Sequence, residues 1–167
     1  MRRSTFPVIF LALFVIATLG GCRKAAVLEN AMVPRLLIET RGVNYGALGG
    51  DVVTLPVSGT SIAVQAQPLV SEFEILNVEQ VKVDMGMALL VQISPKGARE
   101  LYRGSVSNMG GRIVLTVNGN AIGARRIDGA IQDGNFYTFV EVDDAELAQL
   151  VLDMKETLVH IQNEKNN

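Results

Sequence analysis

Two strand-length apolar runs, Arg112 to Val117 and Ala121 to Ile127, are separated only by the turn Asn118-Gly119-Asn120. Asn-Gly between two such runs is the strongest short-range signal for a β-hairpin, because both residues tolerate the positive φ that a tight turn of this kind requires. The sequence therefore predicts antiparallel pairing here, and this hairpin is the starting point for the rest of the fold.

Other β-type runs lie on both sides of the hairpin. Gln80 to Met85 and Met87 to Ile93 meet at Met85-Gly86, which predicts a second hairpin because glycine adopts positive φ without steric cost. The run from Asn135 to Val142 alternates, so one face carries Tyr137, Phe139 and Glu141 and the other Phe136, Thr138, Val140 and Val142. Residues 33–40 are a further β-type run, and 52–57 and 61–67 are short candidate strands.

Two connections have no regular pattern. Residues 41–51 contain four glycines without the lysine or the spacing of a phosphate-binding loop, so we expect a flexible surface loop there. Residues 68–78 are expected to be an extended connection.

Two segments have the caps and the periodicity of amphipathic helices. Ser94 is a preferred N-cap, Pro95 suits the first helical position, and Gly110-Gly111 is expected to end this helix. Its predicted inner face holds Ala98, Leu101, Tyr102, Ser105 and Met109. The second helix is predicted over 143–161, and the last six residues of the chain, 162–167, are expected to fray. Its apolar stripe consists of Leu147, Leu150, Val151, Met154, Leu158 and Ile161.

This pattern predicts an α+β fold, an antiparallel sheet with the two amphipathic helices packed on one face. We expect one such domain over residues 32–167, after a signal peptide at 1–21 and a tether at 22–31. A chain of this size buries roughly 68% of its unfolded surface, so the domain is expected to fold without a metal or a disulfide.

The composition excludes several classes of protein. The chain of 167 residues has one Cys, one His and no Trp, so an internal disulfide, a multi-thiolate metal site and a His-His metal pair are all excluded. The 15 basic residues are outnumbered by 17 acidic ones. Without a basic field or an aromatic-rich groove, nucleic-acid binding is not expected.

The N-terminus has the pattern of an export signal. Met1-Arg2-Arg3 is followed by an uncharged apolar run from Phe6 to Leu19, which is too short for a membrane-spanning helix of about 20 residues. The run ends in Leu19-Gly20-Gly21-Cys22, which resembles the lipobox of bacterial lipoproteins. This resemblance implies cleavage before Cys22 and a diacylglycerol on its thiol, with acyl chains such as palmitate. An ordinary signal peptide with an unpaired thiol is the alternative.

The lipobox resemblance implies a protein held in the cell envelope, facing the periplasm or the outside. Two or more acyl chains anchor a protein stably, and Arg23 and Lys24 lie beside the anchor, where they attract anionic headgroups or simply begin a solvated tether. Position 23 is not Asp, the inner-membrane retention signal of enterobacterial lipoproteins, which favours the outer membrane. The part after cleavage has 13 basic and 17 acidic side chains, a charge of −4.

The order of elements from Met87 to Leu158 resembles a known family. Ser94-Pro95-Lys96-Gly97-Ala98 opens a helix, the hairpin follows at 114–122, Ile131-x-x-Gly134 precedes the next strand, and a helix opens at 143–148. This arrangement is similar to the head of the first periplasmic domain of SecD, the protein-export subunit. The resemblance implies a fold and a link to protein export. SecD continues into transmembrane helices that couple export to the proton gradient, and these are missing here, so we do not expect the translocation motor.

Candidate catalytic residues are few. Ser58, Thr60 and Ser61 do not stand in a Gly-x-Ser-x-Gly motif. The single histidine, His160, lies near the end of the last predicted helix, and we interpret it as a solvated residue. We therefore expect no catalytic residue, no metal and no cofactor.

Two pairs of like charges stand out. Asp143 and Asp144 suggest a carboxylate pair or a calcium loop, but the residues after them lack the alternating ligands and the glycine of such a loop, which favours helix capping. Arg125 and Arg126 form a candidate partner surface. Because neighbouring strand residues point to opposite faces, at most one is expected in a given patch, and both fit solvated edge charges as well.

Two hypotheses of different classes remain. The first is a non-catalytic, membrane-anchored binding or scaffolding module that holds exported or envelope proteins, with strand addition at a sheet edge, either 61–67 or 121–127. The second is an envelope enzyme with an atypical site. A pocket containing titratable groups with shifted pKa values favours the enzyme, and an open sheet edge without one favours the binding module.

Overall fold

A computed structural model describes residues 31–40 and 50–165, and within these ranges every strand pair is antiparallel. The elements, in chain order, are β1 (Pro34–Ile38), β2 (Asp51–Thr54), β3 (Ser61–Val64), the 3-10 helix η1 (Glu72–Glu74), β4 (Ile75–Val83), β5 (Gly86–Ile93), α2 (Pro95–Ser107), β6 (Arg112–Val117), β7 (Asn120–Arg126), β8 (Asn135–Thr138) and α3 (Asp144–Lys165). The predicted α+β class is confirmed. Cys22, the signal peptide and most of the predicted loop 41–51 lie outside the described residues.

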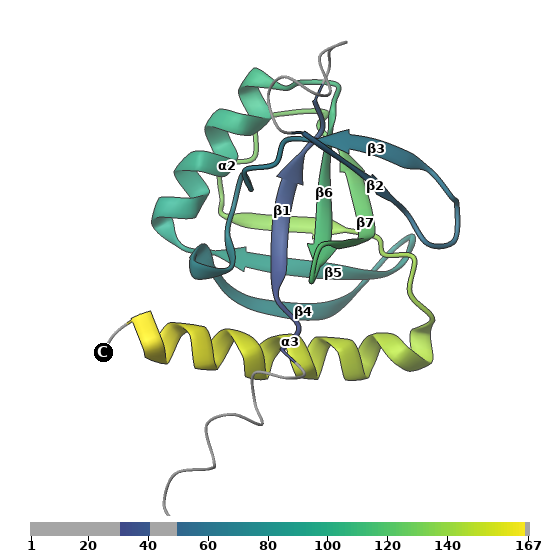
Figure 1. The fold of residues 1–167 in the computed structure, drawn as a ribbon, viewed down its shortest axis with the longest axis vertical. Helices are drawn as coiled ribbons and strands as arrows, with labels where there is room; N and C mark the ends of the chain where they lie inside the picture. Colours follow the sequence, from purple (N-terminus) through teal and green to yellow (C-terminus); the bar gives the residue numbers. More distant parts are fainter. Residues whose placement is uncertain (1–30, 41–49, 166–167) are drawn as a thin grey trace, which may run out of the picture. The chain divides into compact units, whose positions relative to one another are not determined.

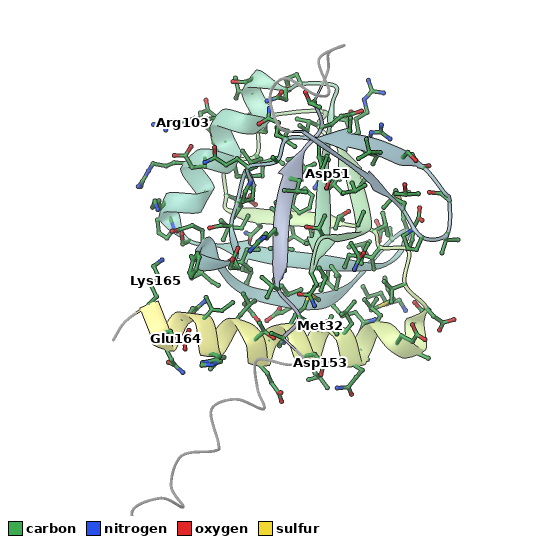
Figure 2. All side chains as sticks on the ribbon, in the orientation of Figure 1. Met32, Asp51, Arg103, Asp153, Glu164 and Lys165 are labelled. Carbon is green, nitrogen blue, oxygen red and sulfur yellow. The ribbon has the colours of Figure 1, made fainter. Side chains whose placement is uncertain are left out.

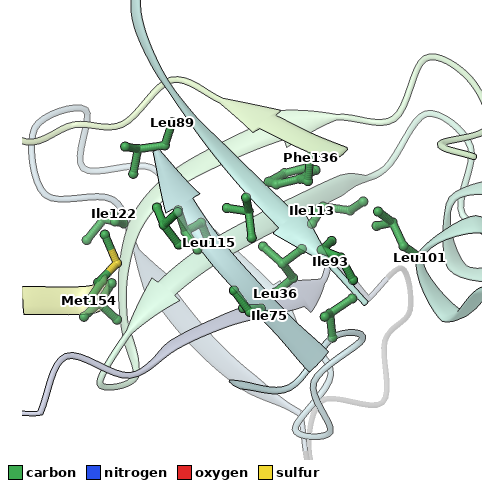
Figure 3. Packing of buried hydrophobic residues seen from close by; sticks show 14 of the residues in the cluster. Leu36, Ile75, Leu89, Ile93, Leu101, Ile113, Leu115, Ile122, Phe136 and Met154 are labelled. Carbon is green, nitrogen blue, oxygen red and sulfur yellow. The ribbon is translucent and has the colours of Figure 1, made fainter. Parts of the chain in front are cut away.

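The described strands form three sheets, in the orders β1-β6-β7, β2-β3 and β4-β5-β8, where the sequence predicted one. The two three-stranded sheets cross one another, since β1, β6 and β7 run across β4 and β5 (Figure 1). Their facing sides enclose the larger core, in which Leu36 and Leu115 from one sheet pack with Leu89 and Phe136 from the other (Figure 3). Both helices add side chains to this core, Leu101 from α2 and Leu147, Val151, Met154 and Leu158 from α3.

A second core covers the outer face of the β1-β6-β7 sheet. The hairpin β2-β3 lies over that face, and its Val53, Ile62 and Val64 pack against Val114 and Ala121. Strand β6 is therefore buried on both sides. This double burial explains why its sequence is almost continuously apolar instead of alternating.

Both predicted hairpin turns are confirmed. Asn118 and Gly119 have φ of 50° and 84°, and Gly86 after the β4-β5 turn has φ of 128°. The Asn118 side chain also accepts a hydrogen bond from the Val33 amide at 2.9 Å, so this turn fixes the entry of the chain into β1.

Helix α2 begins as predicted, with the Ser94 hydroxyl accepting a hydrogen bond from the Gly97 amide at 3.2 Å. Its buried side holds Gly97, Leu101 and Ser105. The prediction that Tyr102 and Met109 face the core was wrong, because both are exposed. Gly97 and Ser105 lie eight residues apart on this side, with Leu101 midway between them. A Cβ at Gly97 would lie 2.6 Å from the Ile93 side chain at the end of β5, so glycine lets the helix approach the sheet closely.

Helix α3 runs alongside β4 and extends to Lys165, beyond its predicted end (Figure 1). The predicted stripe is confirmed: Leu147, Val151, Met154 and Leu158 are buried. The prediction of fraying was wrong for residues 162–165, because the Gln162 amide donates to the Ile75 carbonyl at 3.0 Å and the Lys165 ammonium to the Phe73 carbonyl at 3.0 Å. Lys165 is the last residue of α3 (Figure 2), and residues 166–167 lie outside the described part of the chain. The helix thus covers the start of β4, a sheet-edge strand, where the register is irregular.

The connection 68–78, predicted to be extended, contains η1 and the first residues of β4. In the ranges 31–40 and 50–165, no helix combines the length and the apolar character needed to cross a bilayer.

Candidate binding groove

The outer face of the β4-β5-β8 sheet is divided into a polar half and an apolar half. Register places Val81 opposite Ala88, and Leu90 opposite Tyr137, so these four side chains share that face. At the other end of the same face, the Asn77 amide donates to Glu79 at 2.8 Å and to Gln92 at 3.0 Å. The polar half is satisfied internally, which leaves the apolar half as the part suited to a partner.

A hollow of about 650 Å³ lies at the apolar half, between the β4-β5 turn, β8 and the end of β7. Its exposed apolar side chains are Met85, 84% exposed, with Tyr137 at 38% and Phe139 at 44%. The lining consists of Val83, Asp84, Met85, Ala88, Ala124, Arg125, Arg126, Tyr137, Thr138 and Phe139. We call this hollow the β7–β8 groove.

The groove exists because β7 meets the chain just after β8 at one point, and β7 and β8 separate from there. Gly123 forms a bridge with Val140, and the Glu141 amide donates to the Ile122 carbonyl at 2.7 Å. A Cβ at Gly123 would lie 2.4 Å from the Phe139 carbonyl oxygen, so only glycine allows this approach. From Ala124 to Arg126, no strand within the described residues pairs with the outer edge of β7. The separating strands form the two walls of the groove.

The two arginines that the sequence singled out both border the β7–β8 groove. Arg125 Nη1 donates to the Tyr137 carbonyl at 3.2 Å, which joins β7 to β8. Arg126 Nε lies 3.3 Å from Asp128 Oδ1, in a pair whose side chains are 71% and 77% exposed. The expectation that only one arginine would join a patch was wrong, because the groove crosses the edge of β7 and receives residues from both faces of the strand. Of the two candidate edge strands, 121–127 contains β7, at the edge of the β1-β6-β7 sheet, and 61–67 contains β3, one strand of the two-stranded sheet β2-β3.

The other residues that the sequence singled out lie elsewhere. Asp143 Oδ1 accepts a hydrogen bond from the Ala145 amide at 2.9 Å, as predicted for a cap of α3. His160 is half-buried on α3, with Nε2 3.8 Å from Glu164 Oε1. Ser58 lies in the β2-β3 turn, where its amide donates to Glu141 at 2.8 Å. The structure brings none of these residues to the groove.

The groups with shifted pKa values hold the fold together. The Ser94 hydroxyl, with the ammonium groups of Lys96 and Lys165, keeps the pKa of the buried Glu74 carboxyl below its ordinary value. The hydrogen bond from Arg35 lowers the pKa of Glu72, and the Ser58 amide lowers that of Glu141. None of these carboxylates lines the β7–β8 groove, so their shifts reflect structural contacts.

Sequence reasoning missed Met85, Tyr137 and Phe139 as groove residues. A signal was present, since Tyr137 and Phe139 alternate with core residues and so place two aromatic rings on the outer face. The alternation does not show which face of the strand is left uncovered, because that depends on how the two sheets cross. In residues 31–40 and 50–165, no group of three or more His, Cys, Asp or Glu side chains is arranged to hold a metal ion.

Two solved structures are similar to this chain. One is a crystal structure of SecDF in a super-membrane-facing form, with a TM-score of 0.58, 14% identity and coverage of 78% of this chain and 19% of SecDF. The other, of SecDF as a membrane component that enhances protein export, has a TM-score of 0.57, 16% identity and coverage of 78% and 64%. In fold, the chain resembles part of SecDF. The chain spans less than two thirds of either structure, and no protein-family model or curated protein matches its sequence.

Proposed function

We propose that this protein is a non-catalytic, lipid-anchored module of the cell envelope that binds extended segments of exported polypeptides in the β7–β8 groove. The observation that carries the proposal is the groove itself, an apolar surface beside a strand edge that lacks an outer partner. An extended chain pairs with such an edge through main-chain hydrogen bonds and places alternate side chains on the apolar surface. The shared fold with SecDF, a membrane component that enhances protein export, supports the link to export.

The anchor in this proposal is a diacylglycerol on Cys22. It rests on the lipobox-like Leu19-Gly20-Gly21-Cys22 and on the short apolar run before it. A Cys22→Ser variant is expected to lose the acyl mass. It should then either keep its uncleaved signal segment or, without that segment, leave the membrane fraction after alkaline washing. Unchanged mass and unchanged membrane attachment would contradict the anchor.

Polypeptide binding is tested with the full chain purified in a neutral detergent. The probe is a fluorescent peptide with alternating phenylalanine and serine and blocked ends, and anisotropy reports its binding. We expect saturable binding that a Phe139→Ser variant weakens at least several-fold, because the exposed ring forms part of the apolar wall. Val159→Ser is the matched control, since Val159 is an exposed apolar residue on α3, 61% exposed.

Equal loss of binding in both variants, or no binding to the native chain, would contradict the proposed function. The alternative of an envelope enzyme predicts turnover of a small substrate that a groove variant abolishes. The groups with shifted pKa values give that alternative no support, since each is held in a structural contact outside the groove.

A further inference from the structure

We infer that the β7–β8 groove selects extended polypeptide segments in which an aspartate or glutamate side chain lies beside apolar residues, and that Arg125 and Arg126 bind its carboxylate. This inference rests on the proposed function and names the class of segment that the groove prefers. Its basis is the difference between these two arginines and the other arginines of the sheets.

Two arginines in the sheets are committed to carboxylates of the fold. Arg35 forms a bidentate pair with Glu72, to which it donates two hydrogen bonds of 2.7 Å. Arg112 makes the same kind of pair with Glu39, at 2.7 and 3.1 Å. Both pairs raise the pKa of the arginine, chiefly through these hydrogen bonds. The guanidinium groups of Arg35 and Arg112 are therefore already paired and are not available to bind the carboxylate of an incoming peptide.

Arg125 and Arg126 are held differently. The described partner of Arg125 is the neutral Tyr137 carbonyl, which takes one of the five N–H donors of a guanidinium. Among residues 31–40 and 50–165, no carboxylate forms an ion pair with Arg125. The pair of Arg126 with Asp128 is largely exposed, and an exposed pair of this kind contributes little to stability. A carboxylate arriving in the groove can thus replace Asp128 at little cost and use the bidentate geometry that arginine offers.

The charges of the groove favour an acidic segment. Its lining contains the two arginines of β7 and a single carboxylate, Asp84, in the β4-β5 turn. Met85, Tyr137 and Phe139 line the same groove and provide contact area for neighbouring apolar side chains. A segment that carries an acidic residue beside apolar residues matches this lining.

The carboxylate is expected to belong to a side chain inside the bound segment and not to its C-terminus, because the surface of the groove continues past Arg125. A second hollow of about 380 Å³ shares Arg125 and Tyr137 with the groove and extends along the loop that contains Gln132 and Asp133. A bound chain can therefore pass over Arg125 and continue, whereas a C-terminal carboxylate would have to stop there.

The test compares two peptides with blocked ends that differ only in a central glutamate or glutamine, bound by the full chain in neutral detergent. We expect the glutamate peptide to bind about tenfold more tightly at low salt, with the preference falling as salt is added. The double variant Arg125→Gln/Arg126→Gln is expected to bind both peptides with the affinity that the native chain has for the glutamine peptide. Arg99→Gln, an exposed α2 residue, is the matched control and should keep the preference.

The outcomes separate this inference from the proposed function. Equal binding of the two peptides by the native chain would overturn the acidic preference and leave polypeptide binding in place. A preference that persists in the double variant would overturn the assignment to the two arginines. Binding of neither peptide would remove the proposed function as well. Charge-dependent binding to phosphatidylglycerol vesicles, lost in the double variant and not competed by the glutamate peptide, would show a lipid surface as the ligand and overturn the inference.

Discussion

The two three-stranded sheets share one core and differ in what lies on their other faces. The outer face of β1-β6-β7 is covered by the hairpin β2-β3, so β6 is apolar along nearly its whole length. The outer face of β4-β5-β8 keeps Tyr137 and Phe139 exposed beside the β7–β8 groove. The comparison teaches that a covered outer face serves stability, whereas an uncovered outer face leaves a surface available for binding. The groove beside the uncovered face also takes Arg125 and Arg126 from the edge of β7.

A cavity between the covering hairpin β2-β3 and the β1-β6-β7 sheet should have the largest effect on stability. Ile62, 1% exposed, fills the space between the hairpin β2-β3 and the β1-β6-β7 sheet. Ile62→Ala is expected to lower the free energy of unfolding by about 2–5 kcal/mol, through lost burial and the cavity left behind. Chemical denaturation followed by circular dichroism measures this change.

The matched variant on the open sheet is Phe139→Ser, which should change the free energy of unfolding by about 0.5 kcal/mol or less, because exposed substitutions cost little. Similar losses for Ile62→Ala and Phe139→Ser would break the comparison between the two sheets.

A substitution where β7 crosses the chain after β8 should have the next largest effect on the free energy of unfolding. Gly123→Ala places a Cβ against the Phe139 carbonyl oxygen, and the backbone must shift to relieve the contact. We expect a loss of about 1–3 kcal/mol, with weaker peptide binding because the walls of the groove move. Gly129→Ala is the control, since a Cβ there meets no atom within 4 Å. Equal midpoints of denaturation for the two alanine variants would argue against the close approach.

The Glu74 contacts link η1, α2 and α3 independently of either outer face. The folded-state pKa of Glu74 lies below the ordinary value of 4.5, so its contribution is complete above that pH and is lost as the pH falls through the folded-state pKa. Glu74→Gln should lower the free energy of unfolding at pH 7 by about 1–2 kcal/mol and flatten its decline in acid. Glu100→Gln, in an exposed pair with Arg103, serves as control. An unchanged acid profile for Glu74→Gln would contradict this role.

Local signals in the sequence predicted much of the fold. Asn118-Gly119 fixed a turn, Ser94-Pro95 began α2, and the stripe from Leu147 to Leu158 identified the buried side of α3, because each depends on neighbouring residues. The side of α2 that faces the core was predicted only in part: Leu101 and Ser105 are buried as predicted, whereas Tyr102 and Met109 are exposed and the buried Gly97 was not predicted.

The candidate site was less predictable, because it depends on contacts between distant segments. Arg125 and Arg126 were recognised as a candidate surface from their charge and strand position. Their shared groove requires the bridge between Gly123 and Val140 and the nearby turn at Met85, and no local pattern relates these segments. The extension of α3 to Lys165 likewise depends on a carbonyl of η1 far away in the chain.

Amide hydrogen exchange of the full chain, with and without a saturating acidic-apolar peptide, tests the central claim most directly. The account predicts slower exchange at Ala124 to Arg126, in β8 and in the β4-β5 turn, with little change in β2-β3 and in α2. The first group borders the groove, and the second lies outside it. Protection confined to α2 or to the hairpin β2-β3, or no protection at peptide concentrations that saturate binding, would contradict the account.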